Sequence, residues 1–292
     1  MALNPVDKLL GGYLGFVTIL ILARGPFANG YGWLLLTHVL VYTMLYLFTR
    51  IRETDSVGRA LHTLYPIVML LPLYTEIGVL NAPLGADPAM ANDAVLQRWE
   101  DAIFGGQVSY TWIRESPSVF WSGLFHLAYF AYYPIVTVGP VLMVWRGRHQ
   151  DAHFVLFTTL LAFVVCYVTF VLYPVGGPNY AFEHPTGPVR EVWSARLVYL
   201  LLAGASSFGT AFPSSHVAAT LAATGASWMV WRPLAAAFVV PAILLTIGTV
   251  YCQMHYGIDV VSGALVGIGA TVVAARTCLP KRSETVSSPY AA

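Results

Sequence analysis

The chain has 292 residues, of which 57% are hydrophobic and only 10% are charged, and its formal net charge is +1. An ordinary soluble protein has about 25% charged residues, so this composition excludes a soluble globular enzyme, a disordered chain and a charge-driven nucleic-acid binder. The few charged residues lie in short clusters between long apolar runs. Because a membrane-spanning helix needs about 20 apolar residues, this pattern predicts an all-α polytopic membrane protein.

About eight segments are long and apolar enough to be transmembrane helices. In chain order, we predict spans over 6–23, 31–48, 60–80, 118–145, 152–172, 213–231, 234–251 and 256–276. The polar connection 81–117 mixes charged residues with tryptophans, which is typical of a segment lying at the membrane surface. A second long connection, 173–212, is rich in Gly and Pro. The spacing of the three cysteines indicates neither a disulfide framework nor a metal site.

The distribution of Lys and Arg indicates the orientation in the membrane. With the N-terminus placed in the cytoplasm, ten of these residues fall on the inner side and five on the outer side. The bias predicts that both termini lie inside and that both long connections face outward. Without an organelle signal, we expect the plasma (inner) membrane.

The first motif whose side chains suit a chemical role is Phe212-Pro213-Ser214-Ser215-His216, which runs directly into an apolar segment. Proline followed by serine is a signal for the start of a helix. The free N–H groups and the positive dipole end of a helix N-terminus form an anion site. Two hydroxyls and an imidazole at that end suit a phosphate group.

The second motif is His255-Tyr256-Gly257-Ile258-Asp259. The spacing of four places His255 and Asp259 on one face of a helix, where a carboxylate fixes the histidine tautomer and raises its basicity. His216 and His255 are 39 residues apart, one span across the membrane and one span back. Both histidines are therefore predicted at the same membrane face, where a nucleophile, an acid and anion-binding dipoles allow phosphoryl transfer without a metal.

Together these two motifs resemble those of the membrane-embedded type 2 phosphatidic acid phosphatase superfamily. The run Tyr173-Pro174-Val175-Gly176-Gly177-Pro178 is similar to a loop of its inositol phosphorylceramide synthase branch. The resemblance is strong over 205–270, weaker over 95–204 and absent from the first two spans. It implies a six-helix phosphatase-type core at 59–278 with outward loops 81–117 and 173–212. Two additional N-terminal helices precede this core at 1–58, and a disordered cytoplasmic tail follows at 279–292.

The resemblance also implies a role for each residue of the motifs. His255 attacks phosphorus to form a phosphohistidine, and Asp259 orients it. His216 protonates the leaving oxygen and then activates water or an acceptor alcohol. Ser214 and the backbone of Ser215 contact the phosphate. The substrate is a membrane lipid, and neither a metal nor another cofactor is needed.

The sequence departs from the superfamily's phosphatase pattern at its cationic phosphate clamps. The family's first motif, Lys-x6-Arg-Pro, is missing. The only Arg-Pro pair, Arg232-Pro233, follows the serine motif, and Gly225 stands where the lysine of the motif would be. Gly248 and Thr249 occupy the Ser-Arg positions of the third motif. We therefore expect other residues of the outer loop to bind phosphate, namely Arg190, Arg196, Asn179 and Tyr173.

These features predict a lipid phosphate phosphatase that hydrolyses a phosphomonoester or diphosphate at the outer membrane face. One alternative is a lipid phosphotransferase of the inositol phosphorylceramide or sphingomyelin synthase type, in which an alcohol replaces water. A second alternative is a non-catalytic lipid-binding or transport protein, which the missing clamps would permit. Glu76 and His126, both in the outer thirds of their spans, either line the substrate cavity or pair with each other.

Overall fold

The computed structural model of this protein describes residues 3–25, 32–81, 87–205 and 207–280, and 81% of these residues are helical. In these residues every regular element is a helix, and a single isolated bridge joins Val175 to Thr210. The predicted all-α polytopic fold is confirmed. The expected tail lies outside the described residues from position 281 onward.

Within the described residues, seven helices or helical runs are long and apolar enough to cross a membrane. They are α1 (Pro5–Ala23), α2 (Gly32–Thr49), α3 (Ser56–Asn81), the run Val119–Trp145, α8 (His149–Leu172), α13 (Arg232–Tyr251) and α14 (Gly257–Cys278). The run Val119–Trp145 consists of α6 (Val119–Tyr129), a π-helical turn (Pro134–Val138) and α7 (Gly139–Trp145). The predicted span 213–231 corresponds to α12 (Ser215–Val230), whose 16 residues extend about 24 Å.

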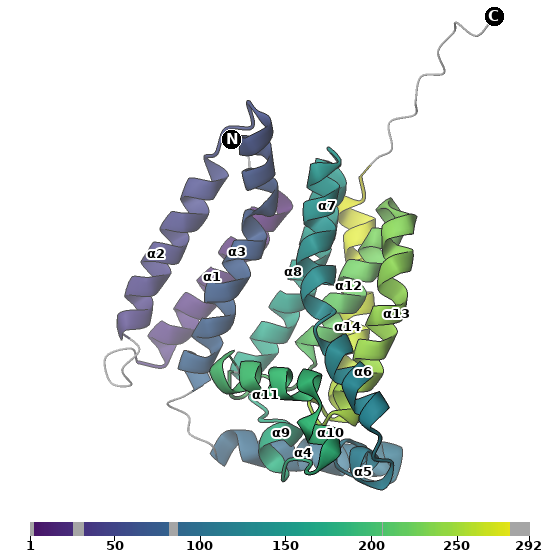
Figure 1. Ribbon diagram of the computed structural model, residues 1–292. Helices are drawn as coiled ribbons and strands as arrows, with labels where there is room; N and C mark the ends of the chain where they lie inside the picture. The colour runs from purple at the N-terminus through teal and green to yellow at the C-terminus, as the bar shows by residue number, and fades with distance from the viewer. Residues whose placement is uncertain (1–2, 26–31, 82–86, 206, 281–292) are drawn as a thin grey trace, which may run out of the picture.

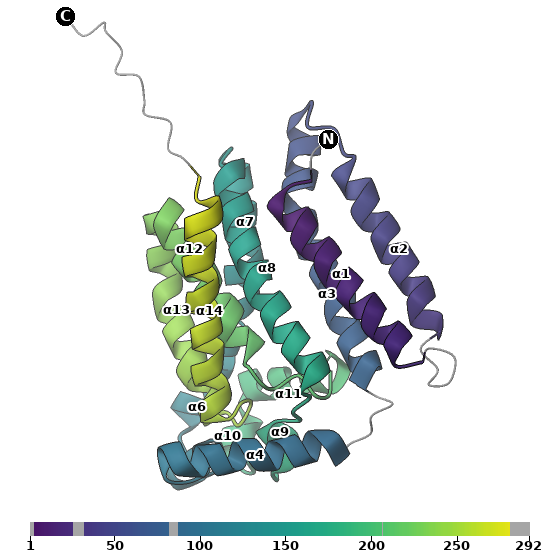
Figure 2. The same cartoon turned by 180° about the vertical axis from the view of Figure 1, so that it is seen from behind.

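The helices form two groups that meet at α8 (Figures 1 and 2). One group consists of α1, α2 and α3, and the other surrounds α12, which packs against α8, α13 and α14. Helix α1 begins and α14 ends at the same end of the bundle. The start of α1 and the end of α14 therefore lie opposite the end that carries both histidine motifs.

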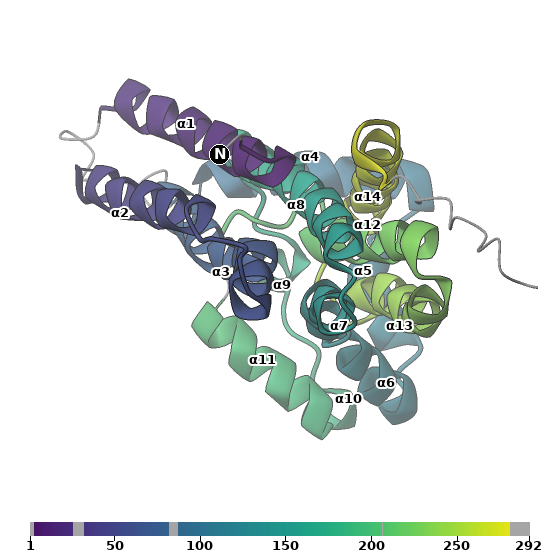
Figure 3. The ribbon, with the colours of Figure 1, turned by 90° about the horizontal axis from the view of Figure 1, so that it is seen from above.

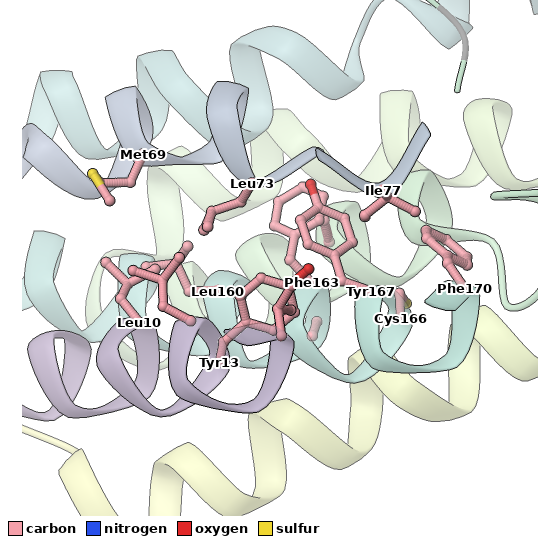
Figure 4. Packing of buried hydrophobic residues seen from close by; sticks show 14 of the residues in the cluster. Leu10, Tyr13, Met69, Leu73, Ile77, Leu160, Phe163, Cys166, Tyr167 and Phe170 are labelled. Atoms are coloured by element: carbon pink, nitrogen blue, oxygen red, sulfur yellow. The ribbon is translucent and has the colours of Figure 1, made fainter. Parts of the chain in front are cut away.

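The two groups share one buried cluster, in which α1 and α3 pack on α8 (Figure 4). Leu10 and Tyr13 from α1 and Leu73 from α3 contact the same core as Phe163 and Tyr167 from α8. Since lipid tails are as apolar as these side chains, close packing, rather than exclusion of water, holds the first three helices in place.

Helices α12 and α14 approach each other closely because α14 carries Gly263 and Gly267. A Cβ atom at Gly263 would lie 2.5 Å from the carbonyl oxygen of Ser214, and one at Gly267 would lie 2.5 Å from that of Ala218. Two glycines four residues apart form the small-residue stripe with which membrane helices pack backbone to backbone. This contact brings the N-termini of α12 and α14 together.

Further helices lie across the end of the bundle that carries both histidine motifs (Figure 2). Helices α4 (Asp87–Phe104) and α5 (Val108–Glu115) come from the connection expected at the membrane surface. The connection 173–212, predicted only as a Gly- and Pro-rich loop, contains α9 (Pro178–Ala181), α10 (Pro188–Glu191) and α11 (Trp193–Ala205). Helix α11 forms because the stretch from Trp193 to Ala203 is apolar and free of Pro and Gly.

Candidate active site

The two sequence motifs meet where α12 and α14 begin. Ser214 is the N-cap of α12, and its Oγ accepts a hydrogen bond from the Val217 N–H at 3.4 Å. The predicted helix start after Pro213 is thus confirmed. The backbone N–H of Ser214 donates to the carbonyl oxygen of Asp259 at 3.0 Å. This bond places the serine motif directly against the first turn of α14.

His255 lies in the connection between α13 and α14, with Asp259 behind it. Nδ1 of His255 is 3.5 Å from Oδ2 of Asp259, and the same Oδ2 accepts the Tyr256 N–H at 2.8 Å. Burial lowers the pKa of His255 to about 4, and a hydrogen bond to the Ala211 backbone opposes this effect. The imidazole is therefore neutral near pH 7, which is the nucleophilic form.

His216 is on the N-terminal turn of α12, and its ring packs against two tyrosine rings from another segment. The ring centroids of Tyr129 and Tyr132 are 4.7 Å and 4.5 Å from that of His216. The Tyr129 hydroxyl is 3.1 Å from Nε2 of His216. The ring centroids of His216 and His255 are 6.1 Å apart, and reacting atoms approach to about 3–3.5 Å before bond formation, so one phosphoryl group can contact both imidazoles.

A cavity of about 610 Å³ opens in front of the two histidines. Its volume lies within the range of about 300–1,000 Å³ that is usual for small-molecule sites. Asn179, Ser215, His216 and His255 line its polar end, while residues of α3, α8 and α11 line its apolar part. Among the described residues that line the cavity, none is Lys, Arg, Asp or Glu. The polar end of this cavity thus offers imidazole, hydroxyl and amide groups rather than charged side chains.

The other residues predicted for the site, Asp259 as the partner of His255 and the rest as phosphate ligands, lie in different surroundings. Ser214 and Asp259 are buried directly behind the cavity wall. The Arg190 guanidinium lies over the Tyr199 ring, 4.7 Å from its centroid. Arg196 is exposed on α11, and Tyr173 is half-buried with its ring 6.4 Å from that of Phe212. Of these five residues, none is among those that line the cavity.

Asp93 on α4, which was not singled out from the sequence, joins the loop at Gly176 and Gly177 to Tyr256 beside His255. Its Oδ2 accepts the Gly176 N–H at 2.7 Å, and its Oδ1 accepts the Gly177 N–H at 2.8 Å and the Tyr256 hydroxyl at 2.9 Å. Burial raises the pKa of Asp93, and these three hydrogen bonds partly offset the increase. The one sequence signal was an acidic residue in an amphipathic segment, which does not distinguish it from its neighbours.

Glu100, also on α4, caps the start of α14. Its Oε2 accepts the Gly257 N–H at 3.0 Å, and its Oε1 accepts the Ser109 N–H at 3.3 Å. Burial raises the pKa of Glu100 to about 7, although the hydrogen bond from Ser109 opposes this effect. Glu100 therefore satisfies one of the free N–H groups at the helix N-terminus that follows His255.

Gln253, two residues before His255, fixes the backbone of the connection. It has φ of 58°, in the left-handed region. Its Nε2 donates to the carbonyl oxygens of Pro178 at 3.2 Å and Glu183 at 3.0 Å. Its Oε1 accepts from Arg114 at 2.7 Å. The connection that carries His255 is thus tied to the segment that carries Asn179.

Glu76 and His126 do not pair with each other, and neither lines the cavity, so both expectations for them are wrong. Glu76 pairs with His38 of α2, with 2.7 Å between Oε2 and Nε2. His126 has its Nδ1 3.3 Å from Sγ of Cys252. The sequence predicts depth in the membrane, but the rotation of each helix about its axis decides which neighbour a side chain faces.

The geometry agrees with a comparison to known proteins. The family model described as the PAP2 superfamily matches residues 96–273, which include both histidine motifs and exclude α3. No curated protein and no solved structure shows a significant match to the chain. The narrower similarity to inositol phosphorylceramide synthases stays a prediction. Since the matched residues make up more than half of the chain, the protein is an integral membrane member of the PAP2 superfamily.

Proposed function

We propose that the protein hydrolyses the phosphate ester of a membrane lipid through a phosphohistidine on His255. The observation that carries this proposal is the meeting of buried His255 and half-buried His216 at one cavity, with the buried Asp259 carboxylate behind His255. A neutral imidazole backed by Asp259 is a nucleophile, whereas two structural histidines would not need to share a cavity. Membership of the PAP2 superfamily supports phosphatase-type chemistry.

In the first step, His255 attacks phosphorus, and Asp259 stabilises the positive charge that develops on the imidazole. The bond between phosphorus and the lipid oxygen breaks, and its electron pair stays on that oxygen. His216, whose ring packs against those of Tyr129 and Tyr132, enters this step protonated, gives its proton to this oxygen and becomes neutral. In the second step, neutral His216 takes a proton from water, and the water oxygen displaces His255 from phosphorus.

The N-terminus of α12 supplies the phosphate-binding dipoles in this mechanism. Ser214 and Ser215 start the helix, and Ser215 and Asn179 both line the cavity. Helix N–H groups favour an anion without a full positive charge. Direct phosphate binding by Arg190, Arg196 and Tyr173 is a separate proposal, which requires these side chains to move toward the cavity. Substituting each of them and comparing KM tests it.

We further propose that the site faces the extracytoplasmic side of the plasma membrane. Eight described cations lie in connections or in terminal helical turns at the end of the bundle where α1 begins and α14 ends: Lys8, Arg50, Arg52, Arg59, Arg146, Arg148, Arg232 and Arg276. Cytoplasmic loops are enriched in Lys and Arg. Labelling of engineered cysteines at both ends, in intact cells and in inverted vesicles, tests this orientation.

Transfer of a lipid headgroup to an alcohol is a second candidate, favoured by the uncharged lining of the cavity. A phosphomonoester carries up to two negative charges at neutral pH, whereas a phosphodiester carries one. Burying charge without a partner is costly, so a cavity without cationic side chains suits the singly charged diester better. Water as acceptor gives a phosphatase, and a lipid or polyol hydroxyl gives a transferase.

The decisive experiment measures phosphate release by purified protein in detergent with chelator present. The substrates are phosphatidic acid, phosphatidylglycerol phosphate, a polyprenyl diphosphate and a phosphosphingolipid, and labelled headgroup transfer to ceramide or diacylglycerol is followed in parallel. Hydrolysis that His255→Ala and His216→Ala both abolish supports the phosphatase. Transfer without hydrolysis supports the second candidate. Absence of both reactions, in protein that remains folded, overturns the enzymatic proposal and leaves a lipid-binding or transport role.

A further inference from the structure

The cavity in front of the histidines extends well beyond the space needed for a phosphate group. Helix α3 forms a large part of its wall through Ile67, Leu70, Leu71, Tyr74 and Thr75. This helix lies outside residues 96–273, which match the PAP2 superfamily. The opposite wall comes from α11 through Val198, Leu201, Leu202 and Gly204. Apart from Tyr74 and Thr75, the side chains of these two walls are aliphatic or absent.

The cavity reaches the lipid-facing surface between these two walls. Leu71 lines the cavity and is 74% exposed, and Leu201 across from it is 40% exposed. Seen from above, α11 runs along the side of the bundle and packs on α6 at one end (Figure 3). Because α3 crosses the membrane, an opening beside Leu71 leads into the hydrocarbon region and not into water.

Tyr74 connects the α3 wall to the catalytic motif. Its hydroxyl accepts the Ser207 N–H at 3.2 Å and lies 3.4 Å from Oγ1 of Thr210. The segment that it holds continues four residues later into Ser214. Gly78, one turn further along α3, packs on the Ser207 side chain. These contacts fix the position of the apolar wall relative to the two histidines.

We propose that the space between α3 and α11 binds a hydrocarbon chain of the lipid substrate, which enters from the bilayer beside Leu71. This inference rests on the proposed function and adds a chain-binding site that uses a helix outside the matched family region. An apolar chain fits because the walls offer no charge, and because the polar end of the same cavity holds both histidines. The site therefore selects lipids by chain length as well as by headgroup.

A substitution that fills the apolar end tests the proposal. Leu71→Trp places a bulky ring in the opening, and Val68→Trp is the matched control, since Val68 is 55% exposed on the same helix but does not line the cavity. With dioleoyl and dioctanoyl forms of one substrate, we expect Leu71→Trp to lower kcat/KM at least tenfold for the long chain and less than twofold for the short one. Equal effects on both substrates, or equal effects of both variants, overturn the proposal.

A second measurement does not depend on catalysis. Phosphatidic acid with a diazirine near the end of one acyl chain is incubated in nanodiscs with the His255→Asn variant and irradiated. We expect labelling of 67–75 and 198–204 that excess unlabelled phosphatidic acid suppresses, while labelling of exposed Leu36 and Leu40 on α2 persists as the bulk-lipid reference. Labelling of 67–75 and 198–204 that resists competition overturns chain binding. If wild-type protein is inactive but competition is seen, the proposed function fails and the chain site stands.

Discussion

The backbone N–H of Ser214 donates a 3.0 Å hydrogen bond to the carbonyl oxygen of Asp259, across 45 residues of sequence. This bond joins the first turn of α12, which carries His216, to the first turn of α14, which follows His255. Both histidines therefore share one rigid support. Changes that separate α12 from α14 are expected to impair catalysis even though they do not touch either ring.

Gly263→Ala is expected to reduce activity at least tenfold. Its Cβ would lie 2.5 Å from the Ser214 carbonyl oxygen, so α14 must move away from α12. Overpacking of this kind costs about 1–3 kcal/mol. Phosphate release and thermal unfolding in detergent measure the two effects. The matched control is Gly269→Ala on the same helix, where nothing lies within 4 Å of the added Cβ and wild-type activity is expected. Equal activity of the two variants would contradict this account.

Asp93→Asn is expected to lower kcat more than tenfold while KM changes less than threefold. The amide keeps the size of the carboxylate but turns an N–H₂ group toward one of the two glycine N–H donors, Gly176 or Gly177. Tyr256 beside His255 also loses its charged acceptor. Asp101→Asn, an exposed position on the same helix, is the control. A change in KM alone would show that Asp93 shapes substrate binding instead of positioning the nucleophile.

Tyr129→Phe is expected to lower kcat about three- to thirtyfold with little change in stability. The ring that stacks on His216 remains, but the hydroxyl 3.1 Å from Nε2 is removed, so the imidazole loses its orienting hydrogen bond. Steady-state kinetics and thermal unfolding distinguish the two effects. Tyr46→Phe on exposed α2 controls for the substitution itself. Unchanged kcat in Tyr129→Phe would mean that stacking alone orients His216.

Glu100 is expected to make folding stability fall as pH rises from about 4.5 to 7. Burial raises its pKa from 4.5 to about 7, so over this interval the folded protein binds more protons here than the unfolded chain does. The stability contributed is full below about pH 4.5 and is lost as pH passes 7. We expect Glu100→Gln to reduce the difference in Tm between pH 5.5 and pH 8 by about 2–5 °C. Exposed Glu115→Gln is the control, and an unchanged pH dependence in Glu100→Gln would refute the assignment.

Local patterns in the sequence determined the helices and the start of the site. Apolar runs indicated the spans to within a few residues, because each helix must satisfy its backbone hydrogen bonds within itself in lipid. Pro213 and Ser214 indicated the start of α12, since capping depends on neighbouring residues only. The separation of His216 and His255 placed both at one end of the bundle, because a span has a fixed length.

Only the tertiary structure decided what surrounds these residues. Asp93 reaches Gly176 across 83 residues and Tyr256 across 163, and Glu76 faces His38 instead of His126. The contribution of α3 to the cavity wall is likewise visible only in the tertiary structure. Hydrophobic periodicity sets how long a helix is and how deep it lies. Its rotation and its neighbours are set by side-chain packing summed over the whole bundle, which no local segment of the sequence encodes.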